Sequence, residues 1–340
     1  MARYTGAMEI HALTEALLHG LPRESMALLP TPLHPLPRLT KALGGPEVWV
    51  KRDDLTGLGG NGNKLRKLEL LLGDALRRGA QTVITTGAGQ SNHARQTAAA
   101  ATRCGLRCVL VLSGAGPTRP NGNLLLDNLF GADVRWAGDR PAQQVMAEVA
   151  AEEASVGRKA YAIPLGGSNA IGAAAYAAAM VELLHQAEVA GVAFDALVVA
   201  CGSGGTQAGL LAGAAAQGWA GRAIGVDVGA LPGGLEPLVH ELANLTIGLL
   251  RIRSSIALER VEIDHRLAEP GYGVLTDAER EAIRLLARCE GLLLDPVYTG
   301  RAMAGLMALV RGGELTAGQR VLFWNTGGEP ALYAYADRLL

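Results

Sequence analysis

The chain has 340 residues, room for about two domains at roughly 150 residues each, and its 49% hydrophobic and 19% charged residues are typical of a folded protein. Lysine and arginine (31) nearly balance aspartate and glutamate (32), so the net charge is −1, and we expect neither nucleic acid nor an anionic membrane as a partner. Cys104, Cys108, Cys201 and Cys289 show no paired spacing, which argues against a disulfide framework and a four-ligand zinc site. We expect no metal.

The stretch from Met1 to Glu24 carries no targeting signal that we can identify. His11, Glu15 and His19 interrupt its apolar residues, and no uncharged run of about 18 residues follows later in the chain. With the sparse cysteines, this pattern favours the reducing cytoplasm, without a membrane anchor.

Short β-rich runs alternate with longer segments of helical periodicity along the chain. The expected strands are residues 47–51, 82–86, 108–113, 134–137, 160–164, 196–200, 224–228 and 321–324. An amphipathic helix is expected from about Lys64, because leucine and alanine recur after it at spacings of three and four. This alternation predicts parallel sheets that are covered by helices on both faces.

Five glycine clusters fall where an expected strand gives way to an expected helix. They are residues 57–62, 87–89, 166–167, 202–205 and 327–328. One such cluster could simply serve a turn with positive φ. Five of them at equivalent strand ends favour a shared ligand-binding cleft.

The first cluster, residues 57–62, matches the GxGxxG pattern of dinucleotide-binding folds, but the nucleotide motifs are incomplete. The next strand ends in Thr85-Thr86-Gly87 without an acidic residue for a ribose, and Leu65 stands where a phosphate-binding loop has its Ser or Thr. What remains is Lys64 at a helix start, where the dipole favours the uncharged amine that a Schiff base needs. A single lysine is usually a solvated surface charge, so the other motifs decide.

A second loop, Gly202-Ser203-Gly204-Gly205-Thr206, follows an apolar run and precedes a helix of small residues. Its backbone N–H groups and two hydroxyls would make a cradle for an anion such as a phosphate monoester. The alternative is close helix-to-strand packing through small residues.

Three more motifs lie at strand ends or glycine turns. They are Gln90-Ser91-Asn92-His93, Asp295 to Gly300 together with Tyr272, and Asn325-Thr326-Gly327-Gly328. Ser91 could simply be a helix N-cap, and residues 325–328 an ordinary strand end. Two of only seven tyrosines beside glycine turns, Tyr272 and Tyr298, suggest phenols that face a cleft, although packed tyrosines are common.

These motifs, together with residues 51–54, 63–69 and 166–169, resemble the D-cysteine desulfhydrase and 1-aminocyclopropane-1-carboxylate deaminase family, which consists of fold type II pyridoxal-phosphate enzymes. The resemblance spans residues 31–335 in family order. It implies an α/β fold of the tryptophan synthase β type, with two three-layer α/β/α domains, pyridoxal 5′-phosphate between them, and a homodimer. We expect residues 1–62 and 170–340 to form the large cofactor-binding domain and residues 63–169 the small domain.

The resemblance also implies roles for single residues at the cofactor. Lys64 would carry it as a Schiff base, Asn92 would contact the phenolic oxygen of its ring, and Thr326 would face the pyridine nitrogen. The phosphate would be held by Gly202, Ser203, Gly204, Gly205 and Thr206.

On the substrate side, the resemblance implies that Gln90 and Ser91 meet the carboxylate or assist proton transfer. Asn92 and Gly167 are expected to contact the substrate as well. Tyr272 and Tyr298 would line this side and take part in catalysis, together with Lys64 and Ser91.

The residue after Tyr298 decides between reactions. The cyclopropane deaminases carry glutamate there, whereas this chain has Thr299, as in the desulfhydrases. This favours β-elimination from D-cysteine or a similar β-substituted alanine, a small amino-acid substrate, to pyruvate, ammonia and sulfide or a thiol. L-cysteate sulfo-lyase and 1-aminocyclopropane-1-carboxylate deaminase are the alternatives, and the stereochemistry of the substrate stays open.

Three positions depart from the usual family pattern: Asn61, Gly89 and Asn325 stand where glycine, a bulkier apolar residue and histidine are common. An altered pocket could therefore serve a different β-substituted alanine. Two rival hypotheses are a nicotinamide dehydrogenase that uses residues 57–62 and a catalytically idle relative that only binds the cofactor or a partner.

Overall fold

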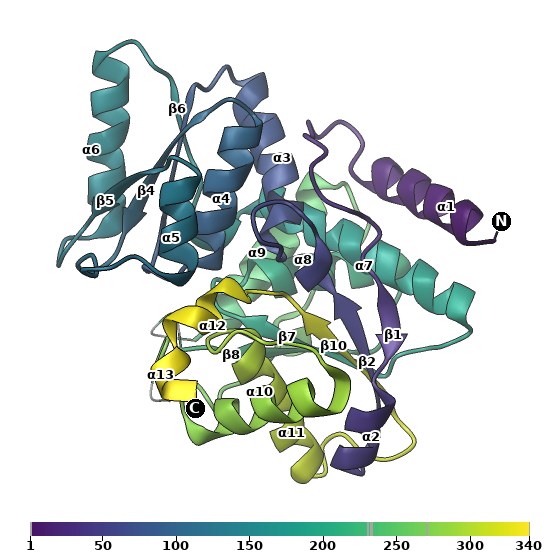
Figure 1. Ribbon diagram of the computed structural model, residues 1–340. Helices are drawn as coiled ribbons and strands as arrows, with labels where there is room; N and C mark the ends of the chain where they lie inside the picture. The colour runs from purple at the N-terminus through teal and green to yellow at the C-terminus, as the bar shows by residue number, and fades with distance from the viewer. Residues whose placement is uncertain (1, 230, 232–233, 270, 340) are drawn as a thin grey trace.

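The chain forms two parallel β-sheets with helices around them, and the computed structural model describes residues 2–229, 231, 234–269 and 271–339. Figure 1 shows the smaller sheet with its helices at the upper left and the larger sheet below it. The predicted α/β fold with sheets covered on both faces is confirmed.

The larger sheet has six strands in the order β1-β2-β10-β7-β8-β9. Their bounds are β1 Leu33–Pro35, β2 Glu47–Arg52, β7 Ala196–Cys201, β8 Arg222–Asp227, β9 Glu262–Asp264 and β10 Arg320–Asn325. All neighbours run parallel except β1, which is antiparallel to β2. The short edge strands β1 and β9 were not predicted, because Leu33–Pro35 and Glu262–Asp264 do not form an apolar run that could be read as a strand.

The smaller sheet has four parallel strands in the order β5-β4-β3-β6. Their bounds are β3 Thr82–Gly87, β4 Arg107–Leu112, β5 Asp133–Trp136 and β6 Ala160–Ala162. These four strands lie within residues 63–169, and the strands of the larger sheet lie outside that range. The domain boundaries themselves stay a prediction.

Alternate side chains of the large-sheet strands enter two separate cores. Val321 and Phe323 of β10 pack toward the side of α2 (Pro37–Leu43), α10 (Asp277–Glu290) and α11 (Thr299–Arg311). Leu322 and Trp324 pack toward α7 (Ala170–Ala190), α8 (Gly205–Gln217) and α9 (Glu236–Leu249). Because both faces are covered, the strands are apolar throughout, as parallel strands require.

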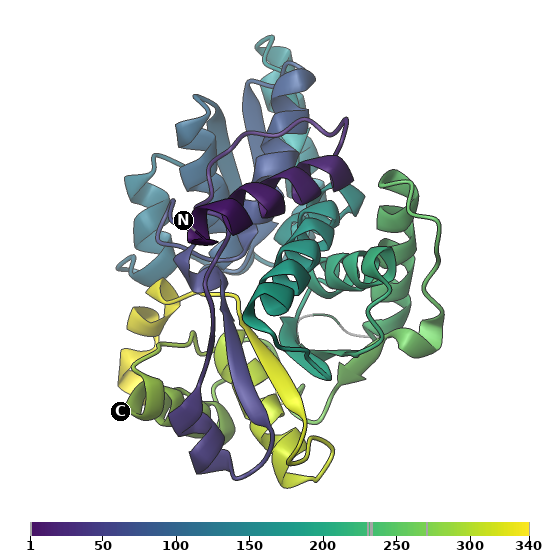
Figure 2. The same ribbon diagram turned by 90° about the vertical axis from the view of Figure 1, so that its right-hand side faces the viewer.

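The smaller sheet is built in the same way. Val83 and Leu110 face α3 (Lys64–Arg77) and α4 (Asn92–Arg103), whereas Ile84 and Val109 face α6 (Ala142–Ser155). Helix α5 (Gly122–Leu129) packs against α4, and the N-terminal helix α1 (Ala2–Leu17) packs against α7, as Figure 2 shows. Short helices complete the chain: η1 Asp53–Leu55, η2 Leu165–Gly167, η3 Leu258–Arg260, α12 Pro330–Ala334 and α13 Ala336–Leu339.

Strands β3, β7 and β10 end at Gly87, Cys201 and Asn325, and each is followed directly by one of the motifs found in the sequence. The carboxyl ends of parallel strands are the usual place for a ligand site. Among the described residues, we find no helix with the length and apolar character needed to cross a bilayer.

Candidate active site

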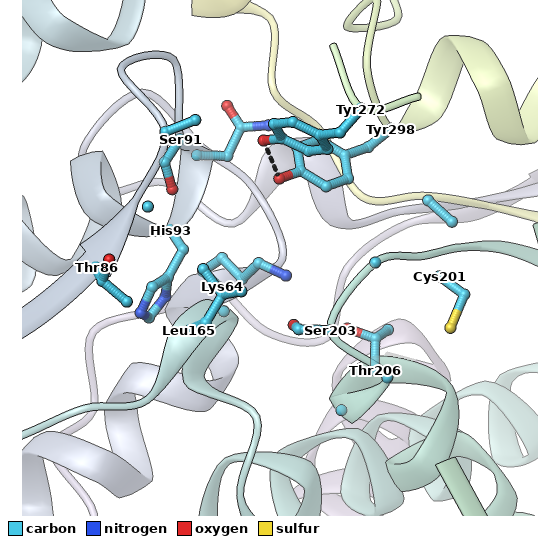
Figure 3. Close-up of a pocket in the computed structure, with 18 of the residues that line it drawn as sticks. Lys64, Thr86, Ser91, His93, Leu165, Cys201, Ser203, Thr206, Tyr272 and Tyr298 are labelled. Carbon is cyan, nitrogen blue, oxygen red and sulfur yellow. Dashed lines mark hydrogen bonds between the residues drawn. The ribbon is translucent and has the colours of Figure 1, made fainter. Parts of the chain in front are cut away.

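A cavity of about 270 Å³ lies where the motifs of the two sheets meet (Figure 3). Most of the predicted site residues line it: Lys64, Ser91, Asn92, Gly202, Ser203, Gly204, Gly205, Thr206, Tyr272, Tyr298 and Thr326. The structure thus brings residues from distant parts of the chain to one wall. Gln90 and Gly167 are the predicted residues that do not line the described cavity.

Lys64 is the first residue of α3 and follows the glycine-rich turn of residues 57–62. The backbone N of Lys64 donates a hydrogen bond to the Gln96 side-chain Oε1 at 3.0 Å, which holds the start of the helix. Its amine points into the space between the tyrosine pair and Ser203 (Figure 3). Burial lowers the pKa of Lys64 to about 8, so about a tenth of the amine is uncharged at pH 7, far more than for an ordinary lysine.

Asn61, one of the departures from the family pattern, fits the turn. Its φ is 65°, a left-handed conformation that asparagine tolerates better than most residues, and its Oδ1 accepts a hydrogen bond from the Gly57 N at 2.7 Å. The turn therefore keeps its shape although a glycine is missing.

Lys67 lies one helical turn after Lys64 and was missed in the sequence. Its side chain is fully buried, and its Nζ donates to the Gly166 carbonyl at 3.2 Å. Burial, with the nearby charge of Lys64, keeps the pKa of Lys67 well below its usual value. The three-residue spacing of the two lysines on a helix could have revealed that both face the same side.

The 202–206 loop forms a cradle at the start of α8. A side chain at Gly205 would collide with the Ser168 hydroxyl at 2.5 Å and approach the Lys67 Nζ to 2.9 Å. The hydroxyl of Thr206 accepts from the Asn63 Nδ2 at 3.2 Å, and the hydroxyl oxygens of Ser203 and Ser168 lie 2.7 Å apart. Free N–H groups of the helix and the hydroxyls of Ser203 and Thr206 therefore line one end of the cavity, with the buried amine of Lys67 behind the loop, which suits a phosphate group.

Close packing through small residues also occurs, but further along α8. A Cβ at Gly209 or Gly213 would lie 2.1 Å or 2.5 Å from carbonyl oxygens of α7. Close packing thus accounts for Gly209 and Gly213, whereas phosphate binding by the 202–206 loop stays a prediction.

Ser91 and Asn92 begin α4. The hydroxyl of Ser91 accepts from the Ala94 N at 3.1 Å as the N-cap, and it also lines the cavity, so capping and exposure to a ligand coexist. The Oδ1 of Asn92 accepts from the Asn123 Nδ2 at 2.8 Å.

His93 lines the cavity as well, and it is a residue that sequence reasoning did not assign. Its Nε2 lies 2.9 Å from the hydroxyl of Thr85, whose proton goes to the Ile163 carbonyl, so Nε2 is the protonated nitrogen. Its Nδ1 has no hydrogen-bond partner among the described residues. Burial and the two lysines keep the pKa of His93 well below its usual value, so the ring is neutral.

Tyr272 and Tyr298 form a hydrogen-bonded pair with 2.7 Å between their hydroxyl oxygens, drawn as a dashed line in Figure 3. Burial raises the pKa of Tyr272 to about 12 and that of Tyr298 well above its usual value. Both phenols are therefore protonated at neutral pH.

Thr299, the residue that we expect to distinguish the two activities, does not line the described cavity. It is fully buried, and its hydroxyl donates to the Asp295 carboxylate at 2.8 Å. The same carboxylate accepts from the backbone N of Val297, Tyr298 and Thr299. This arrangement fixes the turn that presents Tyr298.

Gln90 and Gly167 face away from the cavity. The side chain of Gln90 donates to Asn121 and accepts from the Asn123 N at 2.9 Å. A Cβ on Gly167 would meet Leu71 at 3.0 Å and His93 at 3.4 Å, so this glycine serves packing behind the wall. Contacts of these two residues with a substrate stay a prediction.

The other two departures have structural partners. A Cβ at Gly89 would lie 3.4 Å from the Trp136 ring, which fills the space that a larger residue would occupy. The Oδ1 of Asn325 accepts from the Gly327 N at 3.1 Å and shapes the turn before Gly328.

The residues that line the described cavity include no aspartate or glutamate. Lys64 is among them, and Lys67 lies directly behind the glycine loop. The site is therefore suited to anionic groups such as phosphate and carboxylate.

Comparison with known proteins yields one family and several close relatives. The model of the family "Pyridoxal-phosphate dependent enzyme" matches residues 24–327. A D-cysteine desulfhydrase of Klebsiella pneumoniae is 44% identical over 329 residues, which are 95% of this chain and 98% of the relative. A Pyrococcus furiosus protein with the name "Putative 1-aminocyclopropane-1-carboxylate deaminase" is 43% identical over 97% of this chain and 99% of its own length.

A solved structure has the same fold. The crystal structure of an ACC deaminase homologue superposes with a TM-score of 0.88 at 40% identity, covering 96% of this chain and 98% of that chain.

Proposed function

We infer the reaction of this chain from one premise: it belongs to the pyridoxal-phosphate dependent enzyme family. Its cofactor is pyridoxal 5′-phosphate. We propose that it is a carbon–sulfur lyase, which releases pyruvate, ammonia and sulfide or a thiol from D-cysteine or a similar β-substituted alanine.

The cavity residues fit this cofactor. Lys64 offers a poised amine, and the 202–206 loop with Lys67 behind it offers a cradle in which a side chain at Gly205 would have no room. Asn92 would hold the phenolic oxygen, and Thr326 would face the pyridine nitrogen. When bound, pyridoxal phosphate supplies an electron sink beside the α-carbon of an amino acid.

The protein supplies the proton transfers. The amine of Lys64, with its pKa lowered to about 8 by burial, can take a proton from the substrate α-carbon at its Nζ when it is uncharged. The Tyr272 and Tyr298 hydroxyls, which share one hydrogen bond and stay protonated, can give a proton to the departing sulfur. Ser91 lines the same cavity and can hold the substrate carboxylate.

The proposal depends most on the absence of a carboxylate from the described cavity wall. A hydroxyl such as that of Thr326 leaves a pyridine nitrogen uncharged, which makes a weaker electron sink than a carboxylate partner does. Elimination of a thiol, a good leaving group, tolerates a weak sink. A weak electron sink does not favour the opening of an unactivated cyclopropane ring.

The test is a panel of D-cysteine, L-cysteine, L-cysteate and 1-aminocyclopropane-1-carboxylate with keto-acid release as the readout. We expect pyruvate from D-cysteine and loss of both turnover and the visible absorbance band in Lys64→Ala. Lys159→Ala, a change at an exposed lysine, is the matched control. Pyruvate from L-cysteate alone, or 2-oxobutyrate from the cyclopropane substrate alone, would replace the proposed substrate with that alternative.

The variant Thr299→Glu is a second test, because it introduces the residue that the cyclopropane deaminases are expected to carry at this position. Because the Thr299 hydroxyl is bound to Asp295, a glutamate here would place a second carboxylate beside a buried one. We expect no efficient release of 2-oxobutyrate by this variant, since its carboxylate would not reach the cavity without a rearrangement of the turn.

Assembly and location complete the proposal. Large apolar side chains are exposed on α5 and α12, two helices in contact, namely Leu125 (45%), Leu129 (70%) and Tyr333 (66%). A second copy of the chain would cover them, in line with a homodimer. The four cysteines are free thiols, which suits a reducing cytoplasm.

A further inference from the structure

Asn123, on α5 outside the cavity wall, connects several parts of the site. It is fully buried, and its Nδ2 donates to the Asn92 Oδ1 and to the Gln90 carbonyl, both at 2.8 Å. Its Oδ1 accepts from the Arg95 Nε at 2.9 Å. Each atom of this side-chain amide therefore has a partner.

The orientation of the Asn123 amide follows from the polarity of these partners. A guanidinium has donors only, so the Asn123 oxygen must face Arg95. A backbone carbonyl has acceptors only, so the Asn123 nitrogen must face Gln90. Two independent partners thus fix the same amide orientation.

The orientation of Asn92 then follows in turn. Because Asn123 presents its NH₂ group, Asn92 must present its oxygen, and the Asn92 NH₂ group is left for the cavity. The Nδ2 of Asn92 lies beside Gly328, where a Cβ would come within 2.4 Å of it. Glycine at this position leaves room for the donor.

Arg95 connects the Asn123–Asn92 pair to Lys64, the first residue of α3. The same guanidinium donates through Nη1 to the carbonyls of Gly59 and Asn61, the latter at 2.8 Å, in the turn directly before Lys64. One fully buried side chain therefore holds both the turn of Lys64 and the amide that orients Asn92.

We propose that Asn123, held by Arg95, is a positioning residue that forces Asn92 to present a hydrogen-bond donor to the cavity. The inference rests on the proposed function for the identity of the acceptor, the phenolic oxygen of pyridoxal phosphate. The same proposal gives Gln90 a second role in holding Asn123, since the Gln90 carbonyl is one of the two groups that fix the Asn123 amide.

Asn123→Asp tests the proposal with almost no change in shape. The new carboxylate still accepts from Arg95, but it places oxygen opposite the oxygens of Asn92 and Gln90. Asn92 can relieve this repulsion by turning its amide, which would direct its own oxygen into the cavity. At pH 8, where a carboxylate beside Arg95 is ionised, we expect apo-protein of this variant to bind pyridoxal phosphate at least about tenfold more weakly, with a shifted absorbance maximum.

Asn128→Asp is the matched control, because Asn128 lies on the same helix and donates only to the Leu124 carbonyl at 2.7 Å. We expect its affinity for pyridoxal phosphate to stay within about twofold of the wild type. A change of the same size in both variants would show a general effect of charge on α5 and overturn the proposal.

A double-mutant cycle separates positioning from a general loss of structure. If Asn123 acts through Asn92, Asn123→Asp should change the affinity for pyridoxal phosphate by less than about twofold in an Asn92→Ala background. Additive losses would overturn the proposal, and so would wild-type affinity and absorbance in Asn123→Asp alone. Wild-type protein that binds no pyridoxal phosphate would instead refute the proposed function, so the two failures are distinguishable.

Discussion

Arg66 and Arg95 are both buried and lie on neighbouring helices, α3 and α4, but their guanidinium groups have different partners. Arg66 donates to the carboxylates of Asp53 and Glu182, with distances of 2.9 to 3.2 Å. Arg95 donates to two carbonyls and to Asn123, and its Nη2 has no partner among the described residues.

The carboxylates around the two arginines differ in the same way. Although burial disfavours its charge, the cations Arg66 and Lys51 lower the pKa of Glu182 to about 2. Asp127 is near Arg95, but neither of its oxygens accepts a hydrogen bond from the described residues, and burial raises its pKa to about 7.

The difference shows what a buried charge requires. Around Arg66 the charges and hydrogen bonds compensate one another, and the neighbouring cations lower the pKa of the Asp53 and Glu182 carboxylates although burial opposes their charge. Around Arg95 the compensation is incomplete, and burial lowers the pKa of Arg95 to about 10. This second region has neutral hydrogen-bond partners with fixed polarity, which suit it to orient Asn92 rather than to hold the fold.

The largest effect is expected from Glu182→Leu. Removal of this carboxylate leaves Lys51 and part of Arg66 without compensation in a buried site, which should lower the free energy of unfolding by about 4 kcal/mol. Urea unfolding at pH 7 measures this loss. A loss below about 1 kcal/mol would contradict the view that this cluster depends on mutual compensation.

A smaller effect concerns pH. The pKa of Asp127 is about 7 in the folded chain against an ordinary value of 3.8, so the folded state binds its proton more tightly between these values. The free energy of unfolding should therefore fall with rising pH through this window, by about 2.6 kcal/mol from pH 5 to pH 8. Asp127→Asn should remove this contribution, so the difference between variant and wild type should grow in favour of the variant as pH rises.

Tyr176→Phe should lower the free energy of unfolding by somewhat less than this pH effect. The Tyr176 hydroxyl donates to the Asp53 Oδ2 at 2.6 Å, a hydrogen bond to a charged group. Loss of this bond should lower the free energy of unfolding by about 1.5 kcal/mol. Thermal or urea unfolding would show this, and an unchanged stability would mean that Arg66 and Trp324 satisfy Asp53 without the tyrosine.

The smallest effect is expected at the surface. Arg311 and Glu281 form an ion pair in which both side chains are at least half exposed, at 59% and 50%. Glu281→Gln should change the free energy of unfolding by less than about 0.5 kcal/mol. A loss near that of Glu182→Leu would show that burial is not what distinguishes the two ion pairs.

Local patterns were enough to predict the main strands and the parts of the cavity that follow them. Apolar runs that end in glycine located the 202–206 loop and residues 325–328, because both features lie within a few residues of each other. The place of Lys64 at a helix start after a glycine turn could be predicted for the same reason, whereas its role at the cofactor is implied by the family resemblance and stays a prediction.

What the sequence could not reveal depends on contacts between distant segments. Asn123 contacts Asn92 across 31 positions in sequence, and Arg95 contacts Asn61 across 34. The outward orientation of Gln90 results from the same contacts, so its neighbours Ser91 and Asn92 gave no sign of it. Periodicity describes a residue's face on its own element and carries no information about such partners.

The arrangement of the sheets has a consequence for ligand entry and exit. The chain passes from the larger sheet to the smaller between β2 and β3 and returns between β6 and β7. Lys64 lies on the first crossing and the 202–206 loop follows the second by one strand, so the cavity lies beside both connections between the sheets. A ligand bound to Lys64 and to the 202–206 loop would therefore connect the two sheets, and it could leave only after its contacts with one of them break.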